Sequence, residues 1–168
     1  ARSFDSGGTW DAAGIQTNTT ENLRDITYFD YQVGFAIGDK GQISWTNGGN
    51  VWENLPKLTS EDLNALSKLD SSTAIIVGDA GVILKSEDMA RTWRKINVPF
   101  VENFTSVDFW DKNLGFISGD NGLVIQTKNG GESWVQIPSG TSRNLTGISA
   151  GNPTVAFAVG EDGTILRY

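Results

Sequence analysis

The chain has 168 residues and a formal net charge of −7 at pH 7, with 13 lysines and arginines against 20 aspartates and glutamates. This acidic balance opposes the attraction that supplies most of the affinity for nucleic acids, so we expect no nucleic-acid partner. The absence of cysteine and histidine excludes disulfides, thiolate and imidazole metal sites, and Ser-His-Asp or Cys-His catalysis. No apolar run reaches the roughly 18 to 20 residues that span a bilayer, so no membrane insertion is predicted. The length predicts one domain with its own core, and we expect no cofactor.

The first predicted element is a short polar turn, SFDSGGTW at residues 3–10, which ends in a tryptophan. Similar turns recur along the chain and end 42, 41 and 41 residues apart, at Trp10, Trp52, Trp93 and Trp134. A second pattern, a short apolar run that leads into a glycine turn, recurs 40, 41 and 41 residues apart, at Gly38, Gly78, Gly119 and Gly160. A period in the low forties built from short alternating strands is typical of β-propeller blades.

The repeats divide the chain into four units. Residues 21–60, 61–101 and 102–142 each hold a complete unit, whereas residues 143–168 lack the last turn and strand. The missing turn stands at the other end of the chain, within residues 1–20. We therefore predict an all-β propeller of four blades, a closed ring in which both termini build one blade and fewer sheet edges stay free. The alternative is an arc of a larger propeller that more chain or another subunit completes.

One segment of the second unit has a helical pattern. SEDLNALSKL, residues 60–69, has a capping serine and leucines at helical spacing. Its place in the repeat matches strand-like segments at 23–29 and 104–110. A blade without its inner strand would leave a gap in the ring, so we predict a strand at 62–69.

The turn at 3–10 resembles an Asp-box, the S-x-D-x-G-x-T-W hairpin of BNR-repeat propellers. In such a turn a carboxylate and a hydroxyl bind backbone N–H groups, a glycine permits a left-handed backbone, and the tryptophan packs in the blade contact. The resemblance implies a structural role in all four turns for Ser3, Asp5, Gly7, Thr9, Trp10, Trp52, Ser86, Asp88, Trp93, Asn129, Gly131 and Trp134.

The longer pattern, V-G-F-A-x-G-D-x-G-x-I followed by T-x-x-G-G-x-x-W, resembles the propeller family of photosystem II assembly and stability factors over nearly the whole chain. This resemblance implies a non-catalytic scaffold that docks a protein partner. Asp-boxes also occur in sialidases, and that similarity implies three clamping arginines, a tyrosine nucleophile with a glutamate partner, and an acid. Because Arg91 lies inside a turn and Arg94 follows one, we assign no catalytic residue.

One position of the repeat carries a different side chain in every unit, namely Trp45, Lys85, Gln126 and Arg167. We predict that these side chains stand on one ring face and bind the partner, with Trp45 as an exposed aromatic anchor because its counterparts are polar. The counterparts of Trp110 are mostly apolar, so we expect Trp110 in the core.

Two functional hypotheses remain open. The first is an assembly scaffold for a protein partner, in a lumenal or periplasmic setting. The second is an extracellular or virion module, structural or adhesive, that recognises a surface or a glycan. Either hypothesis allows an oligomer or a larger assembly, and a sialidase-type fragment is the least favoured reading.

Overall fold

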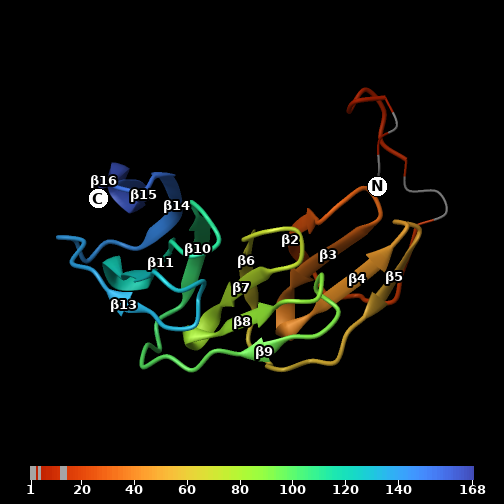
Figure 1. Ribbon diagram of the computed structural model, residues 1–168, viewed down its shortest axis with the longest axis horizontal. Coiled ribbons are helices and arrows are strands. Elements are labelled where there is room, and N and C mark those ends of the chain that lie inside the picture. The colour runs from red at the N-terminus through yellow and green to blue at the C-terminus, as the bar shows by residue number, and fades with distance from the viewer. Residues whose placement is uncertain (1–2, 4, 12–14) are drawn as a thin grey trace.

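The computed structural model describes residues 3, 5–11 and 15–168. In this part of the chain every regular element is a strand or a single 3₁₀ turn, and the strands form four small sheets along an arc (Figure 1). The all-β prediction is confirmed. No helix of the described residues is long and apolar enough to cross a membrane.

The first sheet has five strands in the order β1-β5-β4-β3-β2. Its strands are β1 (Gln16–Thr17), β2 (Leu23–Tyr28), β3 (Val33–Gly38), β4 (Ile43–Asn47) and β5 (Val51–Asn54). β1 pairs with β5 in parallel, and the other pairs of this sheet are antiparallel.

The other three sheets are antiparallel meanders. The second sheet consists of β6 (Leu63–Lys68), β7 (Ala74–Gly78), β8 (Ile83–Ser86) and β9 (Arg94–Lys95). The third consists of β10 (Phe104–Phe109), β11 (Gly115–Gly119), β12 (Val124–Thr127) and β13 (Val135–Gln136). The fourth consists of β14 (Leu145–Asn152), β15 (Val155–Gly160) and β16 (Ile165–Arg167). A 3₁₀ turn joins the second and third strands of each unit: η1 (Asp39–Gly41), η2 (Asp79–Gly81), η3 (Asp120–Gly122) and η4 (Glu161–Gly163).

The segment with the helical leucine pattern is the strand β6, as predicted. It pairs with β7, and a bulge between Leu63 and Ala65 shifts the register. In a helix the leucine spacing would have put Leu63, Leu66 and Leu69 on one face. In the structure Leu63 is fully buried, whereas Leu66 and Leu69 are half-buried. Packing between neighbouring sheets therefore overrides the local helical pattern.

The core lies in layers between the sheets. Successive side chains of a strand point to opposite faces, so each middle sheet packs on both sides. In the second sheet Ile76 and Leu84 pack toward the first sheet, and Ile75 and Ile83 pack toward the third.

The ring is open, which corrects the predicted closure. The fourth sheet has three strands, and β16 forms its edge. The described residues near the N-terminus, 5–11, lie at the far end of the arc from the C-terminus (Figure 1). The backbone N–H of Gln16 donates to the carbonyl oxygen of Asn50 at 2.7 Å. The stacking of neighbouring sheets sets the curvature, and four of them do not bring the ends together. The N-terminal strand therefore pairs with the nearest edge, β5.

Candidate partner-binding site

Two of the four positions predicted to form an exposed face lie instead at the contacts between sheets. Trp45 is only 8% exposed, and its Nε1–H donates to the carbonyl oxygen of Met89, in the second sheet, at 3.0 Å. Lys85 is 6% exposed, and its Nζ lies 2.6 Å from Oε1 of Glu132, in the third sheet. The predicted exposure of Trp45 is therefore wrong, because each of these side chains points at the following sheet.

The residues opposite this position change with it. The guanidinium of Arg91 lies over the Trp45 ring at 4.8 Å from its centroid, and Glu132 stands at the corresponding place against Lys85. An aromatic ring is therefore matched by a cation and a cation by an anion. A position of the repeat can therefore vary and still pack between two sheets, because the residue that faces it varies with it.

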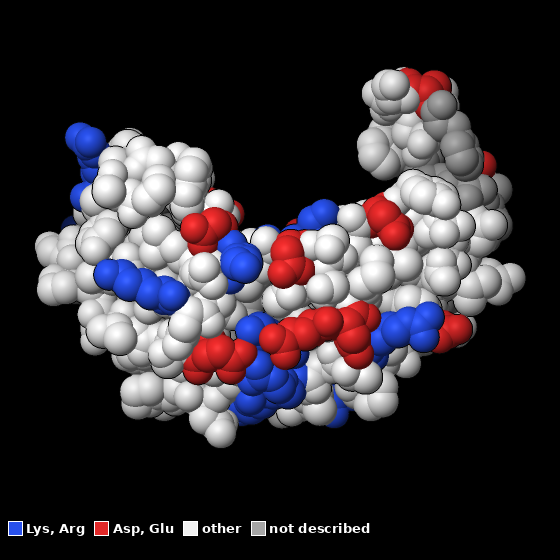
Figure 2. All heavy atoms as spheres, viewed as in Figure 1, with Lys and Arg blue, Asp and Glu red and all other residues white. Residues whose placement is uncertain are grey.

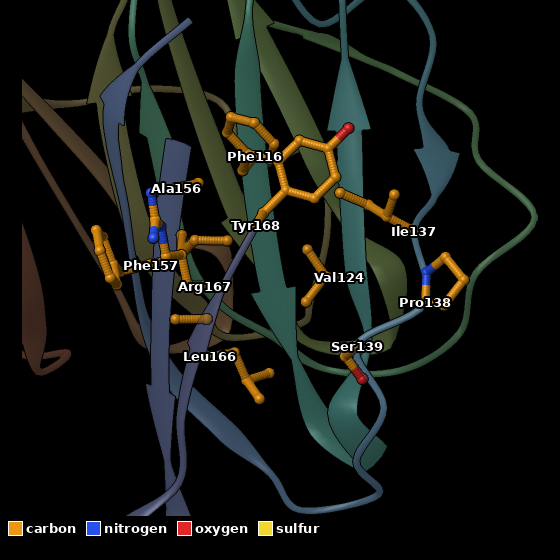
Figure 3. Close-up of a pocket in the computed structure, with 12 residues that line it drawn as sticks. Phe116, Val124, Ile137, Pro138, Ser139, Ala156, Phe157, Leu166, Arg167 and Tyr168 are labelled. Atoms are coloured by element: carbon orange, nitrogen blue, oxygen red, sulfur yellow. The ribbon is translucent and has the colours of Figure 1, made fainter. Parts of the chain in front are cut away.

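Gln126 and Arg167 have fewer neighbours. Gln126 is half-buried beside the fourth sheet, and Arg167 is exposed because no sheet follows it. A small apolar cavity of about 60 Å³ lies between the third and fourth sheets (Figure 3). The ring of Tyr168 lies against that of Phe116 in this cavity, with centroids 5.6 Å apart.

The polar turns are held by side-chain caps. Asp5 accepts hydrogen bonds from the backbone N–H of Thr9 at 2.8 Å and from its hydroxyl at 2.7 Å, and Ser3 Oγ donates to Asp5 at 2.7 Å. Ser3 Oγ also accepts from the backbone N–H of Gly7 at 2.7 Å. These donors stabilise the carboxylate, the Thr9 backbone N–H most, and lower the pKa of Asp5 to about 2.

Two further turns repeat this arrangement. Asp88 accepts from the backbone and the hydroxyl of Thr92, and Ser86 Oγ donates to it. In the next turn Asn129 replaces the acid, and its Oδ1 accepts from the backbone N–H of Ser133 at 3.0 Å. An amide oxygen therefore takes the place of a carboxylate oxygen at this cap.

Three of the turn tryptophans are held in the same way. Their Nε1–H groups donate to the carbonyl oxygens of Gly49, Ala90 and Gly131 at 3.2, 3.1 and 3.1 Å, respectively, from Trp52, Trp93 and Trp134. Trp52 and Trp134 are 6% and 7% exposed, and Trp93 is half-buried. Trp10 is 70% exposed, which corrects its predicted packing role within this chain.

Side-chain caps also hold the loops between the first and second strands of each unit. Asp30, Asp70 and Asp111 each accept two backbone N–H groups that follow them at 2.7 to 2.8 Å, and Asn152 accepts that of Thr154 at 2.8 Å. These backbone donors lower the pKa of the three carboxyl groups. Because every unit runs in the same direction, the four loops lie along one edge of the arc.

We call this edge the hairpin-loop surface and define it by its tip residues Tyr31, Ser71, Lys112 and Pro153 together with Trp110. Tyr31 is 89% exposed and Trp110 is 44% exposed. The prediction of Trp110 in the core is therefore wrong. Sequence analysis missed Tyr31, although a signal was present: each aromatic adjoins the aspartate that caps its loop.

The opposite edge carries an ion network. Arg24 contacts Asp39 through Nε at 2.7 Å and Asp62 through Nη2 at 2.5 Å. The side-chain amide of Asn22 and the Arg24 guanidinium hold the pKa of Asp39 below its usual value. Acidic and basic side chains are interspersed on the face that Figure 2 shows. Further ion pairs join Lys40 to Glu21, Lys85 and Arg94 to Glu87 and Glu132, and Arg143 to Asp162. The described residues contain no group of three acidic side chains that could hold a metal ion.

Three comparisons place this fold among known proteins. Residues 86–140 match the family model described as photosynthesis system II assembly factor YCF48. No curated protein sequence matches the chain. A solved structure described as YCF48 bound to D1 peptide shares 18% identity with a TM-score of 0.73, over 92% of this chain and 52% of that one. YCF48 from Cyanidioschyzon merolae shares 17% identity with a TM-score of 0.71, over 88% and 50%.

An enzyme also shares the fold. An ancestral GH74 enzyme is 17% identical with a TM-score of 0.70, over 88% of this chain and 23% of that one. The chain thus spans about half the length of the two YCF48 structures and a quarter of the enzyme. These findings show a BNR-type propeller fold that resembles the photosystem II assembly factor.

Proposed function

We propose that this chain is a non-catalytic propeller module that binds a protein partner through the hairpin-loop surface. The observation that carries the proposal is the exposure of Tyr31 and Trp110 on loops whose backbone is fixed by aspartate caps. Exposed aromatic side chains on a rigid loop give contact area at little entropic cost, and such residues are enriched among binding hot spots.

The comparisons support binding of a protein by this fold. One of the similar YCF48 structures is described as bound to a D1 peptide. By analogy we propose that this chain also binds a protein, whose identity is to be determined by experiment. Of the four positions first proposed for the partner, Trp45 and Lys85 are committed to sheet contacts, so only Gln126 and Arg167 stay available.

The arrangement of the arginines supports a non-catalytic role. A sialidase-type site needs three guanidinium groups that converge on one carboxylate. Here Arg24 binds Asp39 and Asp62, Arg94 binds Glu132, and Arg143 binds Asp162. Arg24 and Arg94 belong to the first and second sheets, and Arg143 lies in the segment that precedes the fourth.

A glycan is the second candidate ligand, because exposed aromatic rings also stack on sugars. The hairpin-loop surface offers few free hydrogen-bonding groups beside Tyr31 and Trp110, since the aspartate oxygens and the backbone N–H groups of these loops bond to one another. The core of a protein–protein interface is enriched in aromatic residues and depleted of charged ones, and this favours the first candidate.

The test is a quantitative comparison of complexes recovered from the native source. A Tyr31→Ala/Trp110→Ala double variant should lose the bound partner, with an affinity about 30-fold lower or more, as expected for hot-spot residues. Val101→Ala is the matched control, because Val101 is 80% exposed but lies between β9 and β10, away from these loops. Equal recovery by wild type and double variant would contradict the proposed surface, and retention on a glycan array with loss in the double variant would favour the second candidate.

A further inference from the structure

Each junction between neighbouring sheets repeats one polar contact. The second residue of the 3₁₀ turn has a left-handed backbone and donates its N–H to a side-chain oxygen of the following sheet. The three junctions show this bond at 2.9, 3.1 and 2.9 Å, from Lys40 to Asp62, from Ala80 to Asn103 and from Asn121 to Asn144. The fourth turn has the same conformation at Asp162, whose N–H has no such acceptor in the described part of the chain.

The glycine that ends each turn also contacts the following sheet. A Cβ on Gly41, Gly81 or Gly122 would lie 2.0 to 2.1 Å from a backbone carbonyl oxygen of the segment that leads into that sheet. A Cβ on Gly163 would meet nothing within 4 Å. The fourth sheet therefore presents this contact site with no occupant.

One apolar position of the repeat is buried by the following sheet in the first three sheets and exposed in the fourth. Phe35, Ile75 and Phe116 occupy one position of the repeat and are 0%, 0% and 1% exposed, because each packs on the following sheet. Their counterpart Phe157 is 45% exposed. We call this side of the fourth sheet the trailing face and define it by Phe157, Val159, Ile165 and Arg167, which register side by side on β15 and β16.

The first sheet presents the other half of the junction. Leu63, Phe104 and Leu145 are 0% exposed against the preceding sheet, whereas their counterpart Leu23 is 43% exposed. We call this side the leading face and define it by Asn22, Leu23, Ile26 and Tyr28. Asn22 donates its amide to Asp39 just as Asn103 donates to Asp120, which turns its Oδ1 to the place where a preceding turn would bind.

The leading face also contains a cavity that corresponds to the site occupied by Ile75 at an internal junction. Ile75 of the second sheet packs into the next layer beside Phe109, Gly131 and Trp134. The equivalents of these three residues in the first sheet are Tyr28, Gly49 and Trp52, and all three line a cavity of about 530 Å³. A sheet placed before the first one would put its equivalent of Ile75 into this cavity. In the fourth sheet that equivalent is Phe157.

We propose that the trailing face of one chain docks on the leading face of a second copy, and that two copies close a ring head to tail. The two faces are complementary halves of an interface that the chain builds three times within itself, so no new chemistry is needed. Two copies fit because one chain matches 52% and 50% of the two YCF48 structures. The same arrangement brings the N-terminal turn with its exposed Trp10 beside the free edge of β16 of the other copy.

Two single variants test this arrangement. Phe157→Asp destroys the trailing face and leaves the leading face intact, whereas Leu23→Asp does the reverse. Both side chains are exposed in one chain, so each variant should fold, and circular dichroism checks this. The mass in solution is measured by light scattering during gel filtration for each variant alone, for a one-to-one mixture, and for a Val101→Asp control.

The wild type and Val101→Asp should have twice the 18.1 kDa mass of one chain. Each face variant alone should be monomeric, and the mixture should recover the two-chain mass, because one intact trailing face meets one intact leading face. A monomeric wild type, a ladder of larger oligomers, or a dimer that persists in either variant alone would overturn the proposal. The face variants leave Tyr31 and Trp110 unchanged. Tyr31 also lines the cavity of the leading face, so the mass of the Tyr31→Ala/Trp110→Ala variant is measured as well, and a two-chain mass together with loss of the partner separates the two proposals.

Discussion

The second and fourth sheets are built from the same repeat but differ in their surroundings. Ile75 of the second sheet is fully buried, whereas Phe157, the larger side chain at the same position, is 45% exposed. The second sheet lies between two others and has four strands, and the fourth sheet has one neighbour and three strands. The repeat thus determines the shape of a sheet, and the presence of a neighbouring sheet determines whether equivalent side chains are buried or exposed.

The largest expected difference concerns the turn tryptophans. Replacing the buried Trp134 with alanine should lower the free energy of unfolding by about 3 to 5 kcal/mol, as for other large buried aromatics. Trp10→Ala should change it by no more than about 0.5 kcal/mol, because Trp10 is 70% exposed. Urea unfolding below the assembly concentration measures both, and equal losses would contradict the comparison.

A second pair of substitutions isolates one contact of the junction. Gly122→Ala and Gly163→Ala both place a side chain at φ of about +70°, which costs about 1 to 2 kcal/mol. Only Gly122→Ala also drives a Cβ against the carbonyl oxygen of Thr141, so it should lose clearly more stability. Thermal unfolding of the two variants gives the difference, and a difference of zero would mean that the junction yields to the added methyl group.

The smallest effect is a dependence on pH. The backbone N–H groups of Leu114 and Asn113 lower the pKa of Asp111, so its contribution to stability is full above the ordinary value of 3.8 and is lost as the pH falls through the lowered pKa. Asn152 makes the same kind of turn in the fourth sheet without a titratable group. Asp111→Asn should therefore keep the turn and flatten the acid side of the melting-temperature profile, and an unchanged slope would show that this carboxyl group does not contribute.

Sequence analysis predicted most of what the repeat itself determines. The strand at β6 followed from its place in the repeat, although its leucines favoured a helix. The closure of the ring did not follow, because a count of units says nothing about the angle between neighbouring sheets.

The errors at the site arise because the counterparts of a residue in the repeat do not determine its exposure. Polar counterparts suggested that Trp45 was exposed, but the polar counterpart Lys85 is itself buried by an ion pair with Glu132. Trp45 with Arg91 and Lys85 with Glu132 are matched pairs across a junction, and only the direction of each strand reveals which residues meet. Trp110 was misplaced for the converse reason: its counterparts are mostly apolar, but it follows the end of β10 and is 44% exposed at a loop.

A cross-link between two copies tests the central claim most directly. The chain has no cysteine, so Asp162→Cys and Asn22→Cys can be made as separate variants, mixed and oxidised. Ala80→Cys/Asn103→Cys is the internal control. These two residues form the equivalent junction within one chain, where the backbone N–H of Ala80 donates to Oδ1 of Asn103 at 3.1 Å. The account predicts a covalent dimer in the mixture, little in either variant alone, and no change of mass in the control. Free monomers in the mixture, beside a cross-linked control, would contradict it.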